Sequence, residues 1–186
     1  MSEAPRIRDL TDPLAMRALA HPVRLALLDA LTEAAVLTAT QAAERVGESP
    51  SSCSFHLRQL AKYGFVERVE GGGGRERPWR RTHDGLAFTD QHEAPDAAMA
   101  AGALDRAVRA RRDARLHAAR AARPLLPAAW RAVTGESQFV VRITPEELRA
   151  LDATMTELLR RFTARADPPA GAEPVEVLLS AHRVAD

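Results

Sequence analysis

The chain has 186 residues, of which 46% are apolar and 27% are charged, and its formal net charge is +1. This length suits one domain or two small ones, and a charge near zero excludes a general attraction to nucleic acid, so any such affinity must come from local basic clusters. One cysteine excludes an internal disulfide, and no apolar run resembles a signal peptide or a membrane span, so we expect a cytoplasmic protein with no membrane partner.

The first part of the chain contains two signals for helix starts. We expect residues 1–11 to form an arm outside the packed core. Asp12 followed by Pro13, and His21 followed by Pro22, each place a capping side chain before a proline at the first helical position. Two helices are therefore predicted, and the second supplies leucines to the core. Residues 37–39 are expected to add a short strand to a later hairpin.

Residues 38–63 have the pattern of two short helices joined by a tight turn. Thr38 and Gln41 have the spacing of a capping box, and Gly47 stands where a left-handed helix cap favours glycine. Ser49 then precedes Pro50, which predicts the start of a second helix that ends at Tyr63. The sequence thus predicts a helix–turn–helix.

The second of these helices has one apolar and one polar face. Cys53, Leu57 and Leu60 recur at helical spacing and are expected to be buried. The other face carries hydroxyls, a phenyl ring, an amide and cations, which suit the major groove of DNA because arginine and glutamine can bond base edges and serine and lysine can bond phosphates. The candidate DNA-binding residues here are Ser49, Ser51, Ser52, Ser54, Phe55, Arg58, Gln59 and Lys62.

A basic hairpin is predicted directly after this helix. Residues 65–70 and 76–82 are expected to be its strands, with four glycines at the tip. Trp79 is expected to pack at the base of the hairpin. The arginines of the hairpin are predicted to reach the DNA backbone or the minor groove; those proposed as contacts are Arg75, Arg77, Arg80 and Arg81.

These motifs resemble the winged helix–turn–helix of the ArsR-like bacterial transcriptional regulators. The resemblance is carried by LAHPVRLALLDAL (19–31), by TATQAAERVGESPSSCSFHLRQLAKYGFV (38–66) and by the glycine-tipped hairpin, a little under half of the chain. It implies that residues 50–63 are a recognition helix, that residues 68–81 are a wing, and that the protein is a dimeric repressor or activator. The chain after Asp90 does not resemble the short metal-sensing members.

The stretch from His83 to Asp96 is polar and is predicted to be a linker or a loop. It contains potential metal ligands, but their spacing matches no metal-binding template, so we expect no metal site. We place a domain boundary here, with a winged helix–turn–helix DNA-binding domain over residues 1–90. Residues 91–186 are predicted to form a dimerisation domain, and effector binding by this domain is left open.

The second predicted domain begins with a long alanine-rich helix over residues 97–123. Small residues recur along it at alternating spacings of three and four, which is typical of a helix that pairs closely with another helix. We call these positions the alanine seam and propose them as the dimer contact: Ala100, Ala103, Ala107, Ala110, Ala114, His117 and Ala121. Arginines surround the seam and are expected to be solvated.

A small strand–helix–strand unit is predicted at the end of the chain. Residues 138–143 and 175–181 are strand candidates because they are rich in β-branched and other apolar residues. Thr144, Pro145 and Glu147 mark the start of a helix between them. This unit is expected to bind an effector or to form a dimer. The predicted fold class is mainly α with small β, namely a winged helix–turn–helix, a long helix and this unit.

No motif in the sequence indicates catalysis or a cofactor. We therefore predict no enzyme but a sequence-specific transcriptional regulator, a repressor, that binds an inverted repeat in double-stranded DNA as a homodimer. A small-molecule effector is left open. The alternative is a winged-helix adaptor that binds another protein. The basic hairpin and the polar helix face favour DNA, because adaptors tend to expose apolar stripes.

Overall fold

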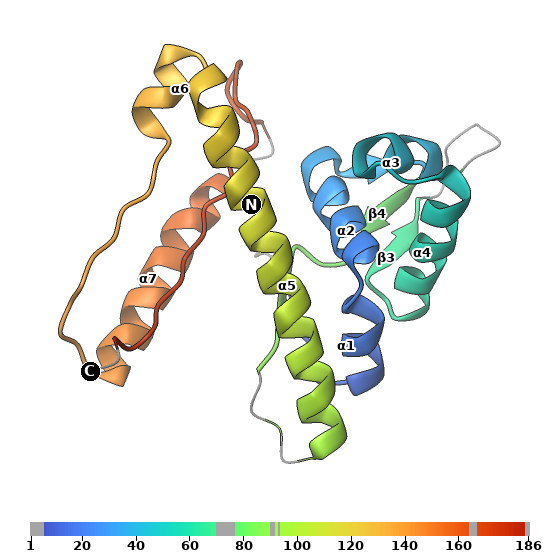
Figure 1. Cartoon of the computed structure of the whole chain (residues 1–186), viewed down its shortest axis with the longest axis horizontal. Coiled ribbons are helices and arrows are strands. Elements are labelled where there is room, and N and C mark those ends of the chain that lie inside the picture. Colours follow the sequence, from blue (N-terminus) through green and yellow to red (C-terminus); the bar gives the residue numbers. More distant parts are fainter. Residues whose placement is uncertain (1–5, 70–76, 90–91, 93, 164–166, 185–186) are drawn as a thin grey trace.

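The computed structural model describes residues 6–69, 77–89, 92, 94–163 and 167–184. The chain is mainly helical with a few short strands, which confirms the predicted fold class at that level (Figure 1). The elements of the winged part, in chain order, are β1 (Ile7–Asp9), α1 (Pro13–Leu19), α2 (Pro22–Ala34), β2 (Val36–Leu37), α3 (Ala39–Val46), α4 (Pro50–Lys62), β3 (Val66–Arg68), β4 (Trp79–Arg81) and β5 (Gly85–Ala87). They are followed by α5 (Pro95–Ala122), the short 3₁₀ helix η1 (Arg123–Leu125), α6 (Ala128–Val133) and α7 (Pro145–Thr163).

The helix–turn–helix forms as the capping residues predict. At the start of α3, the backbone N–H of Gln41 donates to Thr38 Oγ1 at 3.2 Å, and the N–H of Thr38 donates to Gln41 Oε1 at 2.9 Å. Gly47 ends α3 with a φ of 73°, a left-handed conformation that costs glycine little. Ser49 then accepts the N–H of Ser52 at 3.1 Å and begins α4.

A three-stranded antiparallel sheet forms the wing, in the order β2-β4-β3. Leu37 pairs with Trp79 on one side of β4, and Arg68 pairs with Trp79 on the other. This confirms the expected third strand next to the hairpin, but not its bounds, because Thr38 caps α3 and Ala39 begins that helix. The four glycines of the tip and Arg75 lie outside the described residues.

A second, parallel pair of strands was not foreseen. β1 pairs with β5, so that Ile7 lies opposite Gly85. The N–H of Leu10 also donates to the carbonyl of Ala87 at 2.8 Å. The predicted arm and the predicted linker are therefore wrong over these residues. The pairing joins segments almost eighty residues apart, and neither segment has the apolar alternation that marks a strand locally.

One hydrophobic core unites the winged part with the first half of α5. Leu10, Met16, Leu27 and Leu57 are buried in it, and Leu104 from α5 is buried among them. Figure 1 shows α5 running beside α1. The predicted division at residue 90 therefore does not separate two independent cores, because α5 completes the core of the winged part.

The alanine seam is divided between two environments. Ala100 is buried against its own chain, and Ala103 and Ala107 are half-buried. The remaining members are exposed, namely Ala110, Ala114, His117 and Ala121. Ala100 therefore does not belong to an exposed dimer contact. The spacing of small residues marks a face of close helix packing, but the partner along the first turns is α1 of the same chain.

The end of the chain forms a helix without the two predicted strands. α7 begins at a capping box in which the N–H of Thr144 donates to Glu147 Oε2 at 2.7 Å, as predicted. Residues 138–143 and 175–181 are described but pair with no strand, so the predicted strand–helix–strand unit is wrong. Apolar β-branched residues favour a strand only where a neighbouring strand satisfies the backbone. In Figure 1 the two segments run along opposite sides of α7.

No described helix has both the length and the hydropathy that a membrane crossing requires.

Candidate nucleic-acid interface

α4 presents its two faces as the sequence predicts. Cys53, Leu57 and Leu60 are fully buried. Burial raises the pKa of the Cys53 thiol, with a further contribution from Glu48, so this side chain serves the core as an uncharged thiol. The opposite face carries Phe55, which is 50% exposed. The exposed neighbours of this ring are Ser51, Arg58 and Lys62, and the half-buried ones are Ser52, Ser54 and Gln59.

The side chains at the start of α4 are held together by short contacts. Ser49 Oγ lies 3.1 Å from Ser51 Oγ and accepts the N–H of Ser52. These hydroxyls therefore surround a helix N-terminus, where backbone N–H groups point outward and a negative charge is favoured. Further along, Arg58 has no ion pair or hydrogen bond within the described part of the chain, so its five donors face solvent.

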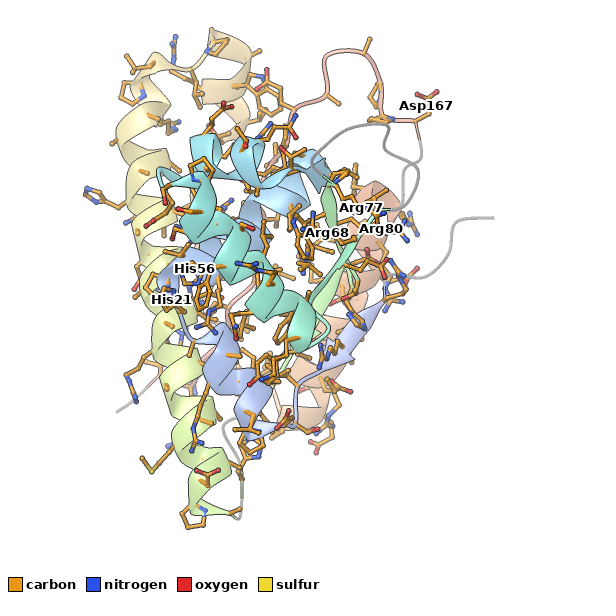
Figure 2. All side chains as sticks on the ribbon, turned by 90° about the vertical axis from the view of Figure 1, so that its right-hand side faces the viewer. His21, His56, Arg68, Arg77, Arg80 and Asp167 are labelled. Carbon is orange, nitrogen blue, oxygen red and sulfur yellow. The ribbon has the colours of Figure 1, made fainter. Side chains whose placement is uncertain are left out.

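The arginines of the wing differ in how firmly they are held. Arg68 lies over the ring of Trp79 at 3.9 Å and donates to the carbonyl of Arg77. Arg80 pairs with Glu67 at 2.7 Å, which offsets part of its charge. Figure 2 shows Arg68, Arg77 and Arg80 gathered on one side of α4. Trp79 is buried at the base of the wing, as predicted. Arg77 is exposed.

Arg81 occupies a different place from the other candidate contacts. It donates a hydrogen bond to Thr32 of α2, and burial lowers the pKa of its guanidinium, against the opposing effect of Asp29 and Asp84. The side chain thus links β4 to α2 within the domain. Because Arg80 and Arg81 are consecutive residues of a strand, the sequence predicts that their side chains point to opposite faces of the sheet. It does not predict which of the two points toward α2.

Two histidines meet behind the polar face of α4, and no pattern in the sequence predicts their contact. His21 caps α2, as its position before Pro22 predicts, and its Nδ1 accepts the N–H of Val23 at 3.3 Å. The ring of His56, from α4, lies 4.6 Å from the ring of His21 (Figure 2). Burial, followed by the charge of Arg24, lowers the pKa of His21, and Glu48 opposes this shift. Burial also lowers the pKa of His56, with smaller contributions from His21 and Arg24.

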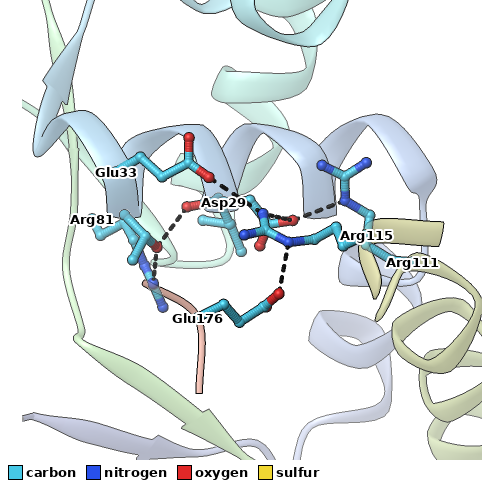
Figure 3. Close-up of polar contacts among 8 residues, drawn as sticks. Asp29, Glu33, Arg81, Arg111, Arg115 and Glu176 are labelled. Carbon is cyan, nitrogen blue, oxygen red and sulfur yellow. Dashed lines mark hydrogen bonds and ion pairs between the residues drawn. The ribbon is translucent and has the colours of Figure 1, made fainter. Parts of the chain in front are cut away.

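An ion-pair cluster connects the winged part to the rest of the chain. Asp29 of α2 lies 2.8 Å from Arg111 and 3.2 Å from Arg115, both on α5. Arg115 also contacts Glu33 at 3.4 Å and Glu176 at 3.2 Å, so it reaches both α2 and the C-terminal segment (Figure 3). The expected solvation of the α5 arginines is therefore wrong for these two, which are half-buried and pair with Asp29 of α2.

A metal centre has no support in the described residues. They contain no group of three or more histidine, cysteine, aspartate or glutamate side chains that could hold an ion. Two of the residues weighed as ligands in the polar stretch, Asp90 and Glu93, lie outside the described part of the chain.

Residues 19–69 match a family model described as a helix-turn-helix domain. The matched range runs from the end of α1 to the residue after β3, so it includes both helices of the motif and the first wing strand. The fold and the family match together define a winged helix–turn–helix domain in this part of the chain. No curated protein matches the chain.

Several solved structures have a similar arrangement at low identity. The chain is similar to MarR from E. coli, with 14% identity, a TM-score of 0.34, and coverage of 80% of this chain and 88% of that chain. A Mycobacterium tuberculosis MarR family protein in complex with salicylic acid has 19% identity, a TM-score of 0.31, and coverage of 80% and 87%. A MarR family transcriptional regulator from Silicibacter pomeroyi has 18% identity, a TM-score of 0.33, and coverage of 83% of each chain.

Proposed function

We propose that the protein is a sequence-specific DNA-binding transcriptional regulator. The observation that carries this proposal is the exposed polar face of α4 beside the arginines of the wing, within a helix–turn–helix domain. A helix of this kind fits the major groove, where Arg58 and Gln59 can bond base edges. The wing then lies beside the groove, where Arg77 can contact a phosphate. The spacing of the motif supports membership in the ArsR-like group.

The proposed operator is an inverted repeat that two copies of the chain occupy. Each chain supplies one recognition helix, and a two-fold dimer places two such helices roughly 34 Å apart, which is one turn of DNA. The proposed action is repression, in which the bound dimer occupies a promoter. The proposed contacts in each half-site come from the exposed face of α4 and from the wing.

Selection of bound fragments from a random duplex library, followed by footprinting, tests this proposal. We expect the enriched fragments to share two related half-sites in inverted orientation, and both to be protected. Enrichment of a single asymmetric half-site would contradict the dimer. Retention of DNA without sequence enrichment, or no retention, would contradict the regulator and favour a winged-helix adaptor that binds protein.

A further inference from the structure

The helix α7 carries an apolar stripe that the chain itself does not cover. Leu148, Leu151, Met155 and Leu158 recur at spacings of three and four residues, so they share one side of the helix. Each of these side chains is 36–47% exposed. Among the described residues, none after Leu104 is buried, so α7 does not pack into a core of its own chain.

The two segments beside α7 are also apolar and open. Phe139 and Val140 precede the helix and are 83% and 75% exposed, and Val175 and Val177 follow it and are 56% and 55% exposed. Both segments have the composition of strands, yet neither forms a ladder within the described residues. Their backbone groups are therefore available to a neighbouring chain. We call α7 together with these two segments the C-terminal unit.

The C-terminal unit exposes apolar side chains on all three of its segments, and those named above are 36–83% exposed. Summed over the three segments, the exposed apolar area is on the order of 1,000 Å², and exposed apolar area of this kind is typical of a protein–protein contact. A stable dimer buries about 800 Å² on each partner, so the unit supplies the area that such an interface needs.

The charges beside the stripe indicate that the occupant is a second copy. Glu147 precedes Leu151 by one turn and Arg161 follows Leu158 by one turn, so each charge borders the stripe. About four helical turns separate these two residues, which places them on the same side of the stripe at opposite ends. In an antiparallel pair of α7 helices related by a two-fold axis, Glu147 of each copy meets Arg161 of the other.

We propose that the C-terminal unit docks on the same unit of a second copy, with the two α7 helices antiparallel, and that this contact holds the dimer together. The exposed part of the alanine seam is then a minor contact. The inference rests on the proposed function in requiring a two-fold dimer. It names the surface that forms this dimer, on the side of α5 away from α3 and α4 (Figure 1).

Sedimentation of the full chain at micromolar concentration tests where the interface lies. We expect the chain to be a dimer and the Leu151→Asp/Leu158→Asp variant to be a monomer, because the substitutions place charges in the stripe. The matched control is Ala110→Glu/Ala114→Glu on the exposed seam of α5, which we expect to remain a dimer. A monomeric native chain, or dissociation by the α5 control and not by the α7 variant, would overturn the proposal.

Charge reversal tests the antiparallel arrangement without relying on disruption alone. Glu147→Lys and Arg161→Glu should each raise the dimer dissociation constant about tenfold or less, because each brings like charges together in the homodimer. An equimolar mixture should restore native dimerisation, since the reversed pairs are complementary between the two variants. Mixing does not change the substituted helix within either variant. Restored dimerisation in the mixture can therefore come only from contact between the two chains. A mixture as weak as its components would overturn the antiparallel pairing.

The same variants separate this inference from the proposed function. If the regulator proposal holds, the monomeric α7 variant should still protect a single half-site, because its α4 and wing are unchanged. If the native chain selects no DNA sequence but dimerises through α7, the regulator proposal fails while the interface stands. If the native chain selects inverted repeats and the α7 variant remains a dimer, the interface fails while the regulator proposal stands.

Discussion

Substitution of Arg58 tests whether α4 contacts the edges of DNA bases. Its side chain is exposed in the centre of the polar face, without an ion pair among the described residues. We expect Arg58→Ala to weaken binding to the preferred sequence by about 1–3 kcal/mol and to relax the preference at one position of each half-site. Competition binding against single-base variants of the operator measures both effects. The control is Arg106→Ala, an exposed arginine on α5, and an unchanged preference in Arg58→Ala would show that this face does not read DNA.

Arg77 tests the role of the wing as a backbone contact. A lost phosphate contact weakens all sequences to a similar extent and reduces the slope of log K against log salt by about one unit. We expect Arg77→Ala to have this signature, as we do for Arg75. Arg80→Ala serves as the comparison, because Arg80 is already paired with Glu67. A titration at several salt concentrations decides the matter, and a change in sequence preference in Arg77→Ala would point to base contact instead.

The pair His21–His56 predicts how stability depends on pH. The pKa of each histidine is lowered from 6.5 in the folded state, so the unfolded chain binds more protons as the pH falls. The free energy of unfolding should therefore decrease as the pH falls below about 6.5. Asn can accept the same capping bond, so His21→Asn combined with His56→Gln should flatten this decrease.

Denaturant unfolding between pH 7.5 and 5 measures the dependence on these two rings, with His117→Gln on the exposed surface of α5 as the control. The pKa of His83 is also lowered, by burial and by Arg8 and Arg6. His83 is unchanged in the native chain, the double variant and the control, so its effect on the pH dependence of stability is the same in all three. A double variant that loses as much stability with falling pH as the native chain would show that the pair does not carry the effect.

At the scale of elements, the sequence predicted the features that depend on residues close together in the chain, namely helix starts and helix faces. The starts of α3, α4 and α7 depend on side chains within a few residues, and Thr38, Ser49 and Thr144 were assigned correctly as caps. The faces of α4 followed from periodicity in the same way, which located the exposed surface of the candidate site. Which exposed side chains touch DNA does not follow from periodicity.

Non-local pairing explains the errors of the sequence analysis. The parallel pairing of β1 with β5 joins distant segments with no turn between them to mark it. The alanine seam was recognised as a packing face, but small residues at helical spacing do not identify the partner, which is α1 at Ala100. The contact of His21 with His56 and the orientation of Arg81 also depend on how distant elements meet.

Leu104 tests the conclusion that α5 completes the core of the winged part. Its side chain is fully buried, whereas Met99 on the same helix is 73% exposed. We expect Leu104→Ala to lower the free energy of unfolding by about 2–5 kcal/mol, since it leaves a cavity. Met99→Ala should change it by less than about 0.5 kcal/mol. Urea unfolding of both variants provides the comparison, and equal costs would mean that α5 is not part of this core.

At the scale of the whole molecule, α5 separates two surfaces with different proposed tasks. The first half of α5 packs against α1 in the core, and its far end leads toward α7. Figure 1 shows α7 on one side of α5, with α3 and α4 on the other side. Arg115 joins α2 to the C-terminal segment through Asp29 and Glu176, on the route between these surfaces. A dimer formed through α7 thus leaves the exposed face of α4 uncovered in both copies.

A chain that ends after Arg123 tests this division of tasks. It keeps every buried residue of the described core and the whole alanine seam. The ion pairs that it loses include Arg115–Glu176 and Arg120–Glu136, and in each pair the lost glutamate is more than half exposed. Because exposed pairs contribute little, its free energy of unfolding should stay within about 1 kcal/mol of the native value. Sedimentation should show a monomer, since the C-terminal unit is gone. Linked recognition units bind roughly 10²–10⁴-fold more tightly than single ones, so affinity for the inverted repeat should fall by such a factor while affinity for one half-site is unchanged. A shortened chain that remains a dimer and protects both half-sites would instead assign the interface to the alanine seam.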